Sequence, residues 1–566
     1  MSFRAPVADI RFILDQVVPL APVAATERFA EATPDTVEAI LTEAGRLCDE
    51  VIAPLGRTSD LTPARLENGV VRSSPGFADA FRQIAEGGWV GLATDPEYGG
   101  SGLPQALNMA VNEMMAGACL AMELNPLLTQ GQIEALEHHA SDDQKALYIP
   151  KLASGEWSGT MNLTEPQAGS DVGALRTKAE PNGDGTYAIT GQKIFITWGD
   201  ADFVENVSHL VLARLPDAPE GTKGISLFLV PKYLPDANGK PGATNSLKVV
   251  SLEHKLGIHG SPTCVMSYDG ATGWIVGAPG KGMAAMFTMM NNARLAVGMQ
   301  GVGVAEAATQ KAAAYAADRV QMGPIIAHAD VRRMLATMRA EVFAARAIGL
   351  ACAVALDMGR ATGEDDWLAR AALLTPIAKA YGTDVGCRVA ETGVQVHGGM
   401  GFIEETGAAQ LYRDARITPI YEGTNGIQAM DLVARKMMDN GEAAFRLMQE
   451  VQDYAASVRH EGGDLAGLAT QVWNAAENLR EATEWLVGQG MQPRFAGAVP
   501  YLDAFARVMG AHYHLRAAVA EGGAGDRTTL ARVYVTRLLP RHAAALAEAK
   551  VGEADLYALS DAAFAG

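Results

Sequence analysis

The sequence predicts a multi-domain protein that is mainly α-helical and has one compact antiparallel β domain near its middle. Apolar residues recur at helical spacing over residues 36–155, and helical patterns return from about residue 280. Between them lie short runs rich in β-branched and aromatic residues, separated by turn clusters at 181–185 and 235–242. A chain of 566 residues is long enough for three or four such domains.

Composition and charge are typical of a soluble globular protein, with 48% hydrophobic and 20% charged residues. The net charge of −19 disfavours nonspecific binding to nucleic acid or anionic membrane, because phosphate neutralisation needs clustered Lys and Arg. No continuous apolar run reaches the roughly 18–20 residues that a membrane-spanning helix needs. The N-terminus resembles neither a secretory signal nor a transit peptide. Five cysteines without a C-x-x-C pair favour a reducing, cytoplasmic environment, with no disulfide framework and no metal site.

We expect five segments along the chain. They are an N-terminal extension (1–35), an N-terminal helical domain (36–158), a middle β domain (159–278), a helical bundle (279–440) and a C-terminal helical domain (441–566). The sequence TPD at 33–35 is a helix N-terminal signal. A loop rich in Gly and Pro at 95–104 interrupts the first helical domain.

The expected strands and core helices follow from periodicity. Strands are predicted at 186–197, 209–214, 224–230, 247–252 and 263–268. Two helical stripes of apolar residues predict packed helix faces, one from Val331 to Leu356 and one from Leu465 to Leu486. The second stripe lies in the C-terminal helical domain.

Five short motifs carry groups suited to binding and catalysis. They are MNLTEPQAGS (161–170), FIT (195–197), NNARLAVGMQG (291–301), QVHGGMGF (395–402) and ITPIYEGTNGIQ (417–428). Glycine and hydroxyl residues allow a flat ligand to approach the backbone, and adjacent glycines suit phosphate or adenylate binding. Taken singly, each motif has a plain structural reading, because glycine pairs are mostly turns and a lone arginine or glutamate is mostly a solvated charge.

Together and in this order, the motifs resemble those of the acyl-CoA dehydrogenase family of flavoproteins, over about residues 36–438. The resemblance implies a helical domain, an antiparallel β domain and a four-helix bundle, followed here by the additional C-terminal helical domain. It implies FAD as cofactor and an acyl-CoA as substrate. The long form, with its segments 4–9 and 260–265, is most similar to bacterial members that act on 3-methylmercaptopropionyl-CoA and related short-chain thioesters.

The resemblance also assigns contacts to FAD. Those nearest the flavin ring are Met161, Leu163, Thr164, Gly169, Ser170, Phe195, Ile196 and Thr197. The more distant ones are Arg319, Gln395, Gly398, Gly399, Thr424 and Asn425. Many relatives have tryptophan where Phe195 stands, and we expect Trp198 to replace part of that contact. Arg319 is expected to reach the pyrophosphate of a neighbouring subunit.

Substrate contacts follow from the same resemblance. Ser170, Asn291, Arg294 and Gly423 are expected to border the acyl-CoA, with Arg294 near the beginning of a helical run. His397 is expected to be a packing residue.

Glu422 is the predicted catalytic base. The α-hydrogen of a thioester is weakly acidic, so its removal needs a carboxylate within reach and donors that hold the developing enolate oxygen. Enclosure by flavin and acyl chain would raise the pKa of this carboxyl group towards working pH.

The function expected is FAD-dependent α,β-dehydrogenation of a short- or medium-chain acyl-CoA to a trans-2-enoyl-CoA. An electron-transfer flavoprotein is the expected electron acceptor, and the protein is expected to form a homodimer or homotetramer. Three alternatives stay open: an acyl-CoA oxidase, a DNA-binding flavoprotein relative and a catalytically inactive scaffold. The mixed charge of the C-terminal domain disfavours the second, and Glu422 together with the flavin motifs disfavours the third.

Overall fold

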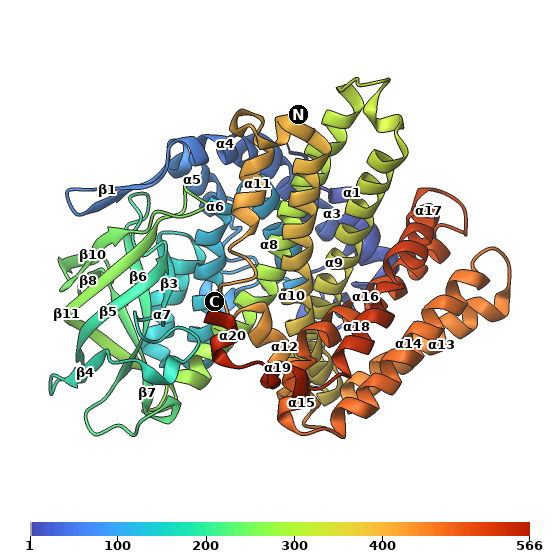
Figure 1. The fold of residues 1–566 in the computed structure, drawn as a ribbon. Coiled ribbons are helices and arrows are strands. Elements are labelled where there is room, and N and C mark those ends of the chain that lie inside the picture. Colours follow the sequence, from blue (N-terminus) through green and yellow to red (C-terminus); the bar gives the residue numbers. More distant parts are fainter. Residues whose placement is uncertain (1–2, 566) are drawn as a thin grey trace.

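The computed structural model describes residues 3–565 and places a β domain at one side of a large helical body (Figure 1). The predicted class, mainly helical with a central β domain and a C-terminal helical region, is confirmed. The helices of the N-terminal region lie behind the β domain and the bundle. The helices of the C-terminal region pack on the side of the bundle that faces away from the β domain.

The N-terminal region is mainly helical, and its first helix begins at Val7. Its α-helices are α1 (Val7–Phe12), α2 (Ala21–Ala24), α3 (Pro34–Leu47), α4 (Ala53–Leu61), α5 (Phe77–Glu86), α6 (Gln105–His139) and α7 (Asp142–Ala153). Helix α3 begins at the predicted signal, because the Thr33 hydroxyl accepts a hydrogen bond from the Thr36 amide at 3.2 Å. Helix α6 is bent at Cys119, whose φ of −160° and ψ of 96° are not helical.

The β domain contains one seven-stranded sheet in the order β10-β11-β5-β4-β6-β3, with β7 pairing both β11 and β6. Its strands are β3 (Trp157–Asn162), β4 (Lys178–Pro181), β5 (Tyr187–Thr197), β6 (Asn206–Arg214), β7 (Ile225–Pro231), β10 (Leu247–Leu252) and β11 (Thr263–Val276). Two small hairpins pair β1 (Arg65–Glu67) with β2 (Val70–Arg72) and β8 (Tyr233–Pro235) with β9 (Pro241–Thr244). The five predicted runs correspond to β5, β6, β7, β10 and β11.

The sheet departs from a purely antiparallel arrangement at two points. One is a short parallel contact of β4 with β6, at Lys178 and Arg214. The other is strand β3, which carries the beginning of the first motif and pairs in parallel with β6. Periodicity did not identify β3 because its side chains are buried on both faces, so the polar–apolar alternation of a half-buried strand is missing.

The bundle is formed by α8 (Gly282–Asp318), α9 (Ala329–Thr362), α10 (Asp365–His397), α11 (Ala408–Ala415) and α12 (Asn425–Val433). Helix α6 packs along α8, and α8 packs along α9 and α10, so the N-terminal region and the bundle share one core. The predicted stripe from Val331 to Leu356 lies on α9.

Among the described residues, one helix, α9, is long and apolar enough to resemble a membrane span. A window of 18 residues in α9 has a mean hydropathy of 1.6, which is sufficient by length and composition for a membrane span. It contains no continuous apolar run of that length, because Arg346 and Asp357 interrupt the apolar sequence. In the structure 89% of that window is buried inside the protein, as expected of a core helix.

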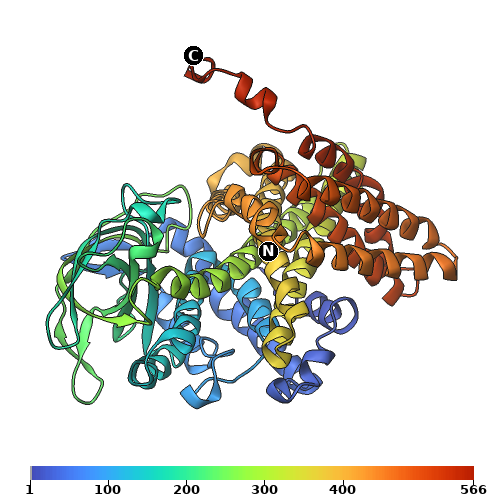
Figure 2. The ribbon, with the colours of Figure 1, turned by 90° about the horizontal axis from the view of Figure 1, so that it is seen from below.

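The C-terminal region is formed by α13 (Glu442–Glu461), α14 (Ala466–Val487), α15 (Met491–Ala496), α16 (Ala498–Ala520), α17 (Asp526–Val533) and α18 (Arg541–Ala549). Helix α16 packs against α9, α10 and α12, and the N-terminal extension also contacts it. An ion pair of 2.7 Å between Arg527 and Asp9 joins α17 to α1. The last helices, α19 (Ala554–Ala558) and α20 (Asp561–Ala565), are exposed and project from the body (Figure 2).

A buried ion-pair network ties α6, α8 and α9 together. Arg346 on α9 donates to Glu113 on α6 at 2.7 Å and to Glu306 on α8 at 2.8 Å. The Arg346 and Glu113 side chains are each 1% exposed. Removing the arginine would leave two carboxylates in the core without their cation, which is far more costly than losing a surface pair.

We therefore predict that Arg346→Met lowers the free energy of unfolding by about 3–5 kcal/mol, measured by chemical denaturation. The matched control is Arg333→Met on the same helix, where Arg333 pairs with Asp330 at the surface with side chains 49% and 70% exposed. That change is expected to cost less than about 1 kcal/mol. Equal effects of the two substitutions would contradict this account of the core.

Candidate active site

Glu422 lies on a sharp turn between α11 and α12. Its φ is +56° and that of Gly423 is +83°, so two successive residues adopt the left-handed conformation. This is costly for a glutamate, and such strain concentrates at functional sites. Gly423 is required here because a Cβ atom would meet Nε2 of Gln428 at 2.9 Å. Thr424 then caps α12 by accepting a hydrogen bond from the Ile427 amide at 3.2 Å.

The charges of two cations act on the buried carboxyl group of Glu422. Burial raises the pKa of Glu422 to about 7, and the charges of Arg294 and Lys379 act in the opposite direction. The residue keeps part of its surface accessible. A carboxyl group in this state exchanges a proton near neutral pH and can still be reached by a ligand.

Arg294 corrects the simplest sequence interpretation, which was a solvated charge at a helix beginning. It lies well inside α8 and is 4% exposed. Its guanidinium lies 3.9 Å from Asp431 and donates to Asn291 at 3.3 Å. It also lines a cavity of about 150 Å³, together with Asn291.

Lys379 on α10 belongs to the site although the sequence analysis did not select it. It is fully buried and donates to Oδ1 of Asn425 at 2.9 Å. Burial lowers the pKa of Lys379 to about 7, while Glu422 and Asp384 raise it. The sequence does contain a feature that could have identified Lys379. It stands within the apolar stretch TPIAKAYG (375–382), where a charged residue is rare unless it is paired.

A second polar layer beside Glu422 is formed by Tyr421 and side chains of α8 and α6. The Tyr421 hydroxyl donates to Oε1 of Gln300 on α8, and Nε2 of Gln300 donates to Oε2 of Glu123 on α6 at 2.6 Å. Gln300 stands in the third motif, but Glu123 lies outside every motif. Sequence patterns could not bring it here, because the contact depends on how α6 packs along α8.

The two motifs assigned to the flavin ring lie side by side at the edge of the β domain. The Ile194 amide donates to the Thr164 carbonyl at 2.9 Å, which joins the end of β5 to the loop after β3. Glu165 fixes this loop through an ion pair of 2.8 Å with the buried Lys193. Phe195 has a φ of +59° and is 59% exposed, so its ring is open to a ligand.

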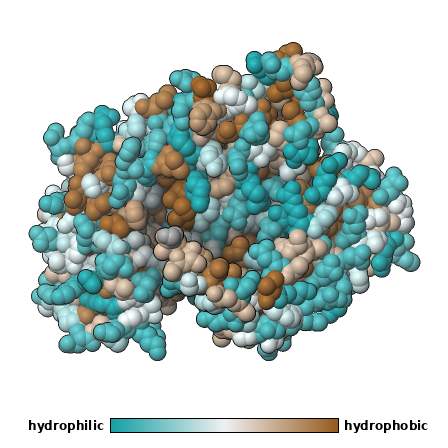
Figure 3. All heavy atoms as spheres, in the orientation of Figure 1, coloured by the Kyte–Doolittle hydropathy of each residue, from teal (hydrophilic) through white to brown (hydrophobic). Residues whose placement is uncertain are grey.

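The other residues of these motifs range from buried to exposed. Ile196 is buried, whereas Met161, Leu163, Thr164 and Thr197 are partly exposed and Gly169 and Ser170 are exposed. Figure 3 shows that this side of the molecule is hollowed where the β domain meets the helical body.

Trp198 does not take the place of an aromatic residue at position 195, and that expectation was wrong. Its side chain is fully buried and packs at 5.3 Å from the Phe203 ring centroid and 6.1 Å from that of Phe77. Its Nε1 donates to the Ala121 carbonyl at 3.2 Å. Trp198 therefore fastens the end of β5 to α6, and Phe195 alone offers an open aromatic ring at this strand end.

Thr424 and Asn425 are occupied by contacts within the protein. The Asn425 amide donates to Asp384 at 2.8 Å and to the Thr383 hydroxyl at 3.0 Å, in addition to its contact with Lys379. The structure thus gives these side chains a role in fixing the turn of Glu422, which the sequence did not indicate.

The remaining predicted cofactor residues lie away from Glu422 in this chain. Gln395, Gly398 and Gly399 are exposed at the end of α10, 16 residues beyond Lys379 and therefore about 24 Å along the helix. Arg319 is exposed at the end of α8, and the side chain of Met322 in the same loop is almost fully exposed. His397 is buried and stacks on Tyr315 with ring centroids 4.4 Å apart.

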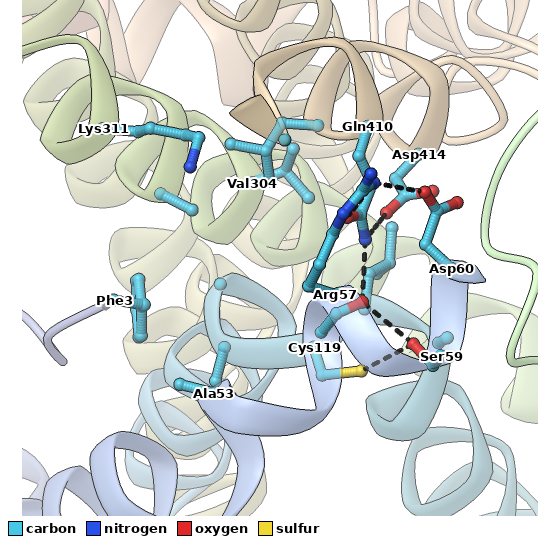
Figure 4. Close-up of a pocket in the computed structure, with 18 of the residues that line it drawn as sticks. Phe3, Ala53, Arg57, Ser59, Asp60, Cys119, Val304, Lys311, Gln410 and Asp414 are labelled. Carbon is cyan, nitrogen blue, oxygen red and sulfur yellow. Dashed lines mark hydrogen bonds and ion pairs between the residues drawn. The ribbon is translucent and has the colours of Figure 1, made fainter. Parts of the chain in front are cut away.

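A larger cavity, of about 370 Å³, contains none of the predicted site residues. It lies between α4, α6, α8 and α11 (Figure 4). Its polar groups largely satisfy one another, since Asp60 pairs with Arg57 at 2.8 Å and Gln410 donates to the Gly56 carbonyl at 2.8 Å. The candidate active site is therefore the one around Glu422.

Four family models match consecutive parts of the chain. They are the acyl-CoA dehydrogenase N-terminal domain over residues 34–156, the middle domain over 160–271, the C-terminal domain over 280–438 and the acetyl-CoA dehydrogenase C-terminal-like domain over 447–560. The chain belongs to the acyl-CoA dehydrogenase family, whose members are flavoprotein oxidoreductases. The predicted family and class of enzyme are confirmed.

Individual relatives are similar over most of the chain. The 3-methylmercaptopropionyl-CoA dehydrogenase of Ruegeria pomeroyi is 46% identical, over 89% of this chain and 88% of that protein. A butyryl-CoA dehydrogenase of Syntrophomonas wolfei is 36% identical, over 79% and 78%. An acyl-CoA dehydrogenase of Bacillus anthracis solved in complex with FAD shares the fold, with a TM-score of 0.75, 22% identity and coverage of 99% and 93%.

The electrostatics of the site predict how Glu422 titrates. With glutamate ¹³C-labelled at the carboxyl carbon, the signal lost in Glu422→Gln should titrate with a pKa of about 7 in the wild-type protein. Arg294→Gln should raise this pKa, because the cation favours the ionised carboxylate.

The control is Arg416→Gln, which removes an exposed arginine at the end of α11. It should leave the titration unchanged. A pKa of Glu422 that falls or stays constant in Arg294→Gln would show that Arg294 does not act on the carboxylate.

Proposed function

We propose that this protein catalyses the FAD-dependent α,β-dehydrogenation of a short- or medium-chain acyl-CoA, with Glu422 as the base that removes the α-proton. The observation that carries the proposal is the position of this carboxyl group. It is held on a strained turn between two buried cations, and its pKa is close to neutrality. A structural glutamate gains nothing from such a position, whereas a general base works best there.

The residues at the edge of the β domain fit the isoalloxazine ring of FAD. Phe195 offers an open aromatic face, and Thr164, Thr197 and Ser170 offer hydroxyl groups with partly or fully exposed surfaces. The glycines at 398–399 would hold the adenylate part, since a Cβ atom at either position would meet no atom within 4 Å. When bound, FAD accepts the β-hydrogen of the substrate with its electron pair as a hydride.

The turn at Glu422 also offers a donor for the substrate. The backbone amide of Glu422 has no hydrogen-bond partner among residues 3–565, while its carbonyl accepts from Nε2 of Gln428 at 3.3 Å. A free amide beside the base can hold the thioester oxygen as negative charge develops on it. The same residue thus removes the proton and stabilises the enolate that its removal creates.

Arg294 and Lys379 set the charge state of the base. Without them, burial would keep Glu422 protonated and unable to accept a proton. Because both cations are themselves buried on helices of the bundle, they hold their positions without relying on solvent-exposed side chains.

The identity of the substrate and partners rests on similarity. The relative from Ruegeria pomeroyi supports 3-methylmercaptopropionyl-CoA as a substrate, and the Syntrophomonas wolfei relative supports butyryl-CoA. We propose an electron-transfer flavoprotein as the acceptor, a cytoplasmic location and a homodimer or homotetramer. Four of the predicted FAD contacts lie far from Glu422 along the helices of the same chain, namely Arg319, Gln395, Gly398 and Gly399. This distance favours an assembly in which neighbouring subunits complete each FAD site.

The proposal predicts that anaerobic addition of a suitable acyl-CoA bleaches the flavin absorbance of the purified holoenzyme. Butyryl-, hexanoyl-, palmitoyl- and 3-methylmercaptopropionyl-CoA would be compared by stopped-flow spectroscopy. Glu422→Gln should bind FAD normally and bleach at least about 10³-fold more slowly, since it lacks the base.

The same preparation separates a dehydrogenase from an oxidase. Reoxidation by oxygen should be slow compared with reoxidation by an electron-transfer flavoprotein. Bleaching that survives in Glu422→Gln would refute the assignment of the base, and rapid oxygen consumption would favour the oxidase.

A further inference from the structure

Asp384 on α10 is joined to the buried cation Lys379 through a single side chain, that of Asn425. Nζ of Lys379 donates to Oδ1 of Asn425 at 2.9 Å, and its ammonium group makes no other hydrogen bond within residues 3–565. Nδ2 of Asn425 donates to Oδ1 of Asp384 at 2.8 Å. The link therefore runs from a carboxylate through an amide to the ammonium group whose charge acts on Glu422.

The Asn425 amide can form this link in only one of its two orientations. Its oxygen accepts hydrogen bonds and its nitrogen donates them, so a half-turn of the amide exchanges the two. A carboxylate only accepts, and Asp384 therefore holds Nδ2 on its own side. The Ala380 carbonyl, at 3.2 Å from the same nitrogen, acts in the same direction, whereas the Thr383 hydroxyl can donate or accept. The amide oxygen is thereby left to face Lys379.

The charges around Lys379 give this orientation a consequence for the base. Burial lowers the pKa of Lys379 to about 7, so its charge at neutral pH depends on its neighbours. Glu422, Asp384 and Cys387 favour the charged ammonium. The Arg294 cation disfavours it. If Lys379 lost its proton more easily, a cation beside Glu422 would disappear and the pKa of Glu422 would rise.

The groups around Asp384 come from the bundle and from the C-terminal region. Burial raises the pKa of Asp384, and Asp503 on α16 acts in the same direction. Arg388, one turn further along α10, and Asn425 favour the ionised carboxylate. Asp503 pairs with Arg507 on its own helix at 2.7 Å. Because α16 packs against α10 and α12, the C-terminal region borders this link directly.

We propose that Asp384 is a positioning residue, which holds the Asn425 amide with its oxygen towards Lys379 and thereby keeps the Lys379 cation beside Glu422. The inference rests on the proposed role of Glu422 as the base and deepens it, since Asp384 acts through two other side chains. The sign of the effect identifies this route. Removing an anion that acted directly on Glu422 would lower the pKa of Glu422, whereas losing the Lys379 cation raises it.

The test measures the pKa of Glu422 in the FAD-loaded protein by ¹³C NMR of its labelled carboxyl carbon. Asp384→Ala removes both the acceptor and the charge, whereas Asp384→Asn keeps the shape and an acceptor oxygen and removes the charge. Asp366→Asn is the matched control. Asp366 lies on the same helix, 18 residues away and therefore about 27 Å along it, and its side chain is 75% exposed.

We expect Asp384→Ala to raise the pKa of Glu422 and to slow flavin bleaching by an acyl-CoA about 5- to 10-fold at pH 6. Asp384→Asn should have a smaller effect of the same sign. The loss should narrow to less than about 2-fold at pH 9, where Glu422 is ionised in both proteins. Asp366→Asn should match the wild-type protein. In a Lys379→Met background, Asp384→Ala should leave the titration of Glu422 unchanged.

Three results would overturn the inference. The first is a pKa of Glu422 that falls or stays constant in both Asp384 variants. The second is an equal rise of this pKa in the Lys379→Met background. The third is a loss of bleaching by the same factor at pH 6 and pH 9, which would reduce Asp384 to a structural role. If Asp384→Ala does not retain FAD, Asp384→Asn decides by the same sign.

Failure of the proposed function itself would look different from these results. The wild-type holoenzyme would then not be bleached by any acyl-CoA. The titration of Glu422 needs no substrate, so it would still show whether Asp384 acts on this carboxyl group through Lys379.

Discussion

The site depends on one electrostatic constraint, which is that a carboxylate must be kept ionisable inside an apolar fold. Burial alone would leave Glu422 protonated, and Arg294 and Lys379 oppose this effect from two different helices of the bundle. The strained turn that presents the carboxylate is held in turn by Thr424, Asn425 and Gln428. Much of the bundle around Glu422 therefore serves to position one acidic group and set its pKa.

The helical body and the β domain contribute different parts of the reaction. The bundle supplies the proposed base and the cations around it, whereas the sheet supplies an open aromatic ring and the loop held by Glu165 and Lys193. Helix α6 joins the two, because its bent segment holds Trp198 of the β domain and reaches Gln300 of the bundle. A shift of α6 would alter both halves of the site at once.

The sequence predicted the parts of this arrangement that depend on local pattern. Five strands of the main sheet, the stripe on α9 and the motif around Glu422 are local, and each was recognisable. Lys379 and Glu123 were missed because their roles arise from helices packing together, which periodicity does not record. Trp198 and Arg294 show the same limit, since an aromatic residue or a cation near a motif can face either the ligand or the core. Only the packing decides between them.

The most direct test of the central claim separates proton removal from oxidation. A 3-thia-acyl-CoA has no hydrogen at its β-position and cannot be dehydrogenated, yet its α-hydrogens can still be removed. In D₂O the FAD-loaded protein should exchange these hydrogens for deuterium, as followed by NMR, and Glu422→Gln should exchange them no faster than buffer. Exchange that continues at the wild-type rate in Glu422→Gln would show that another group is the base.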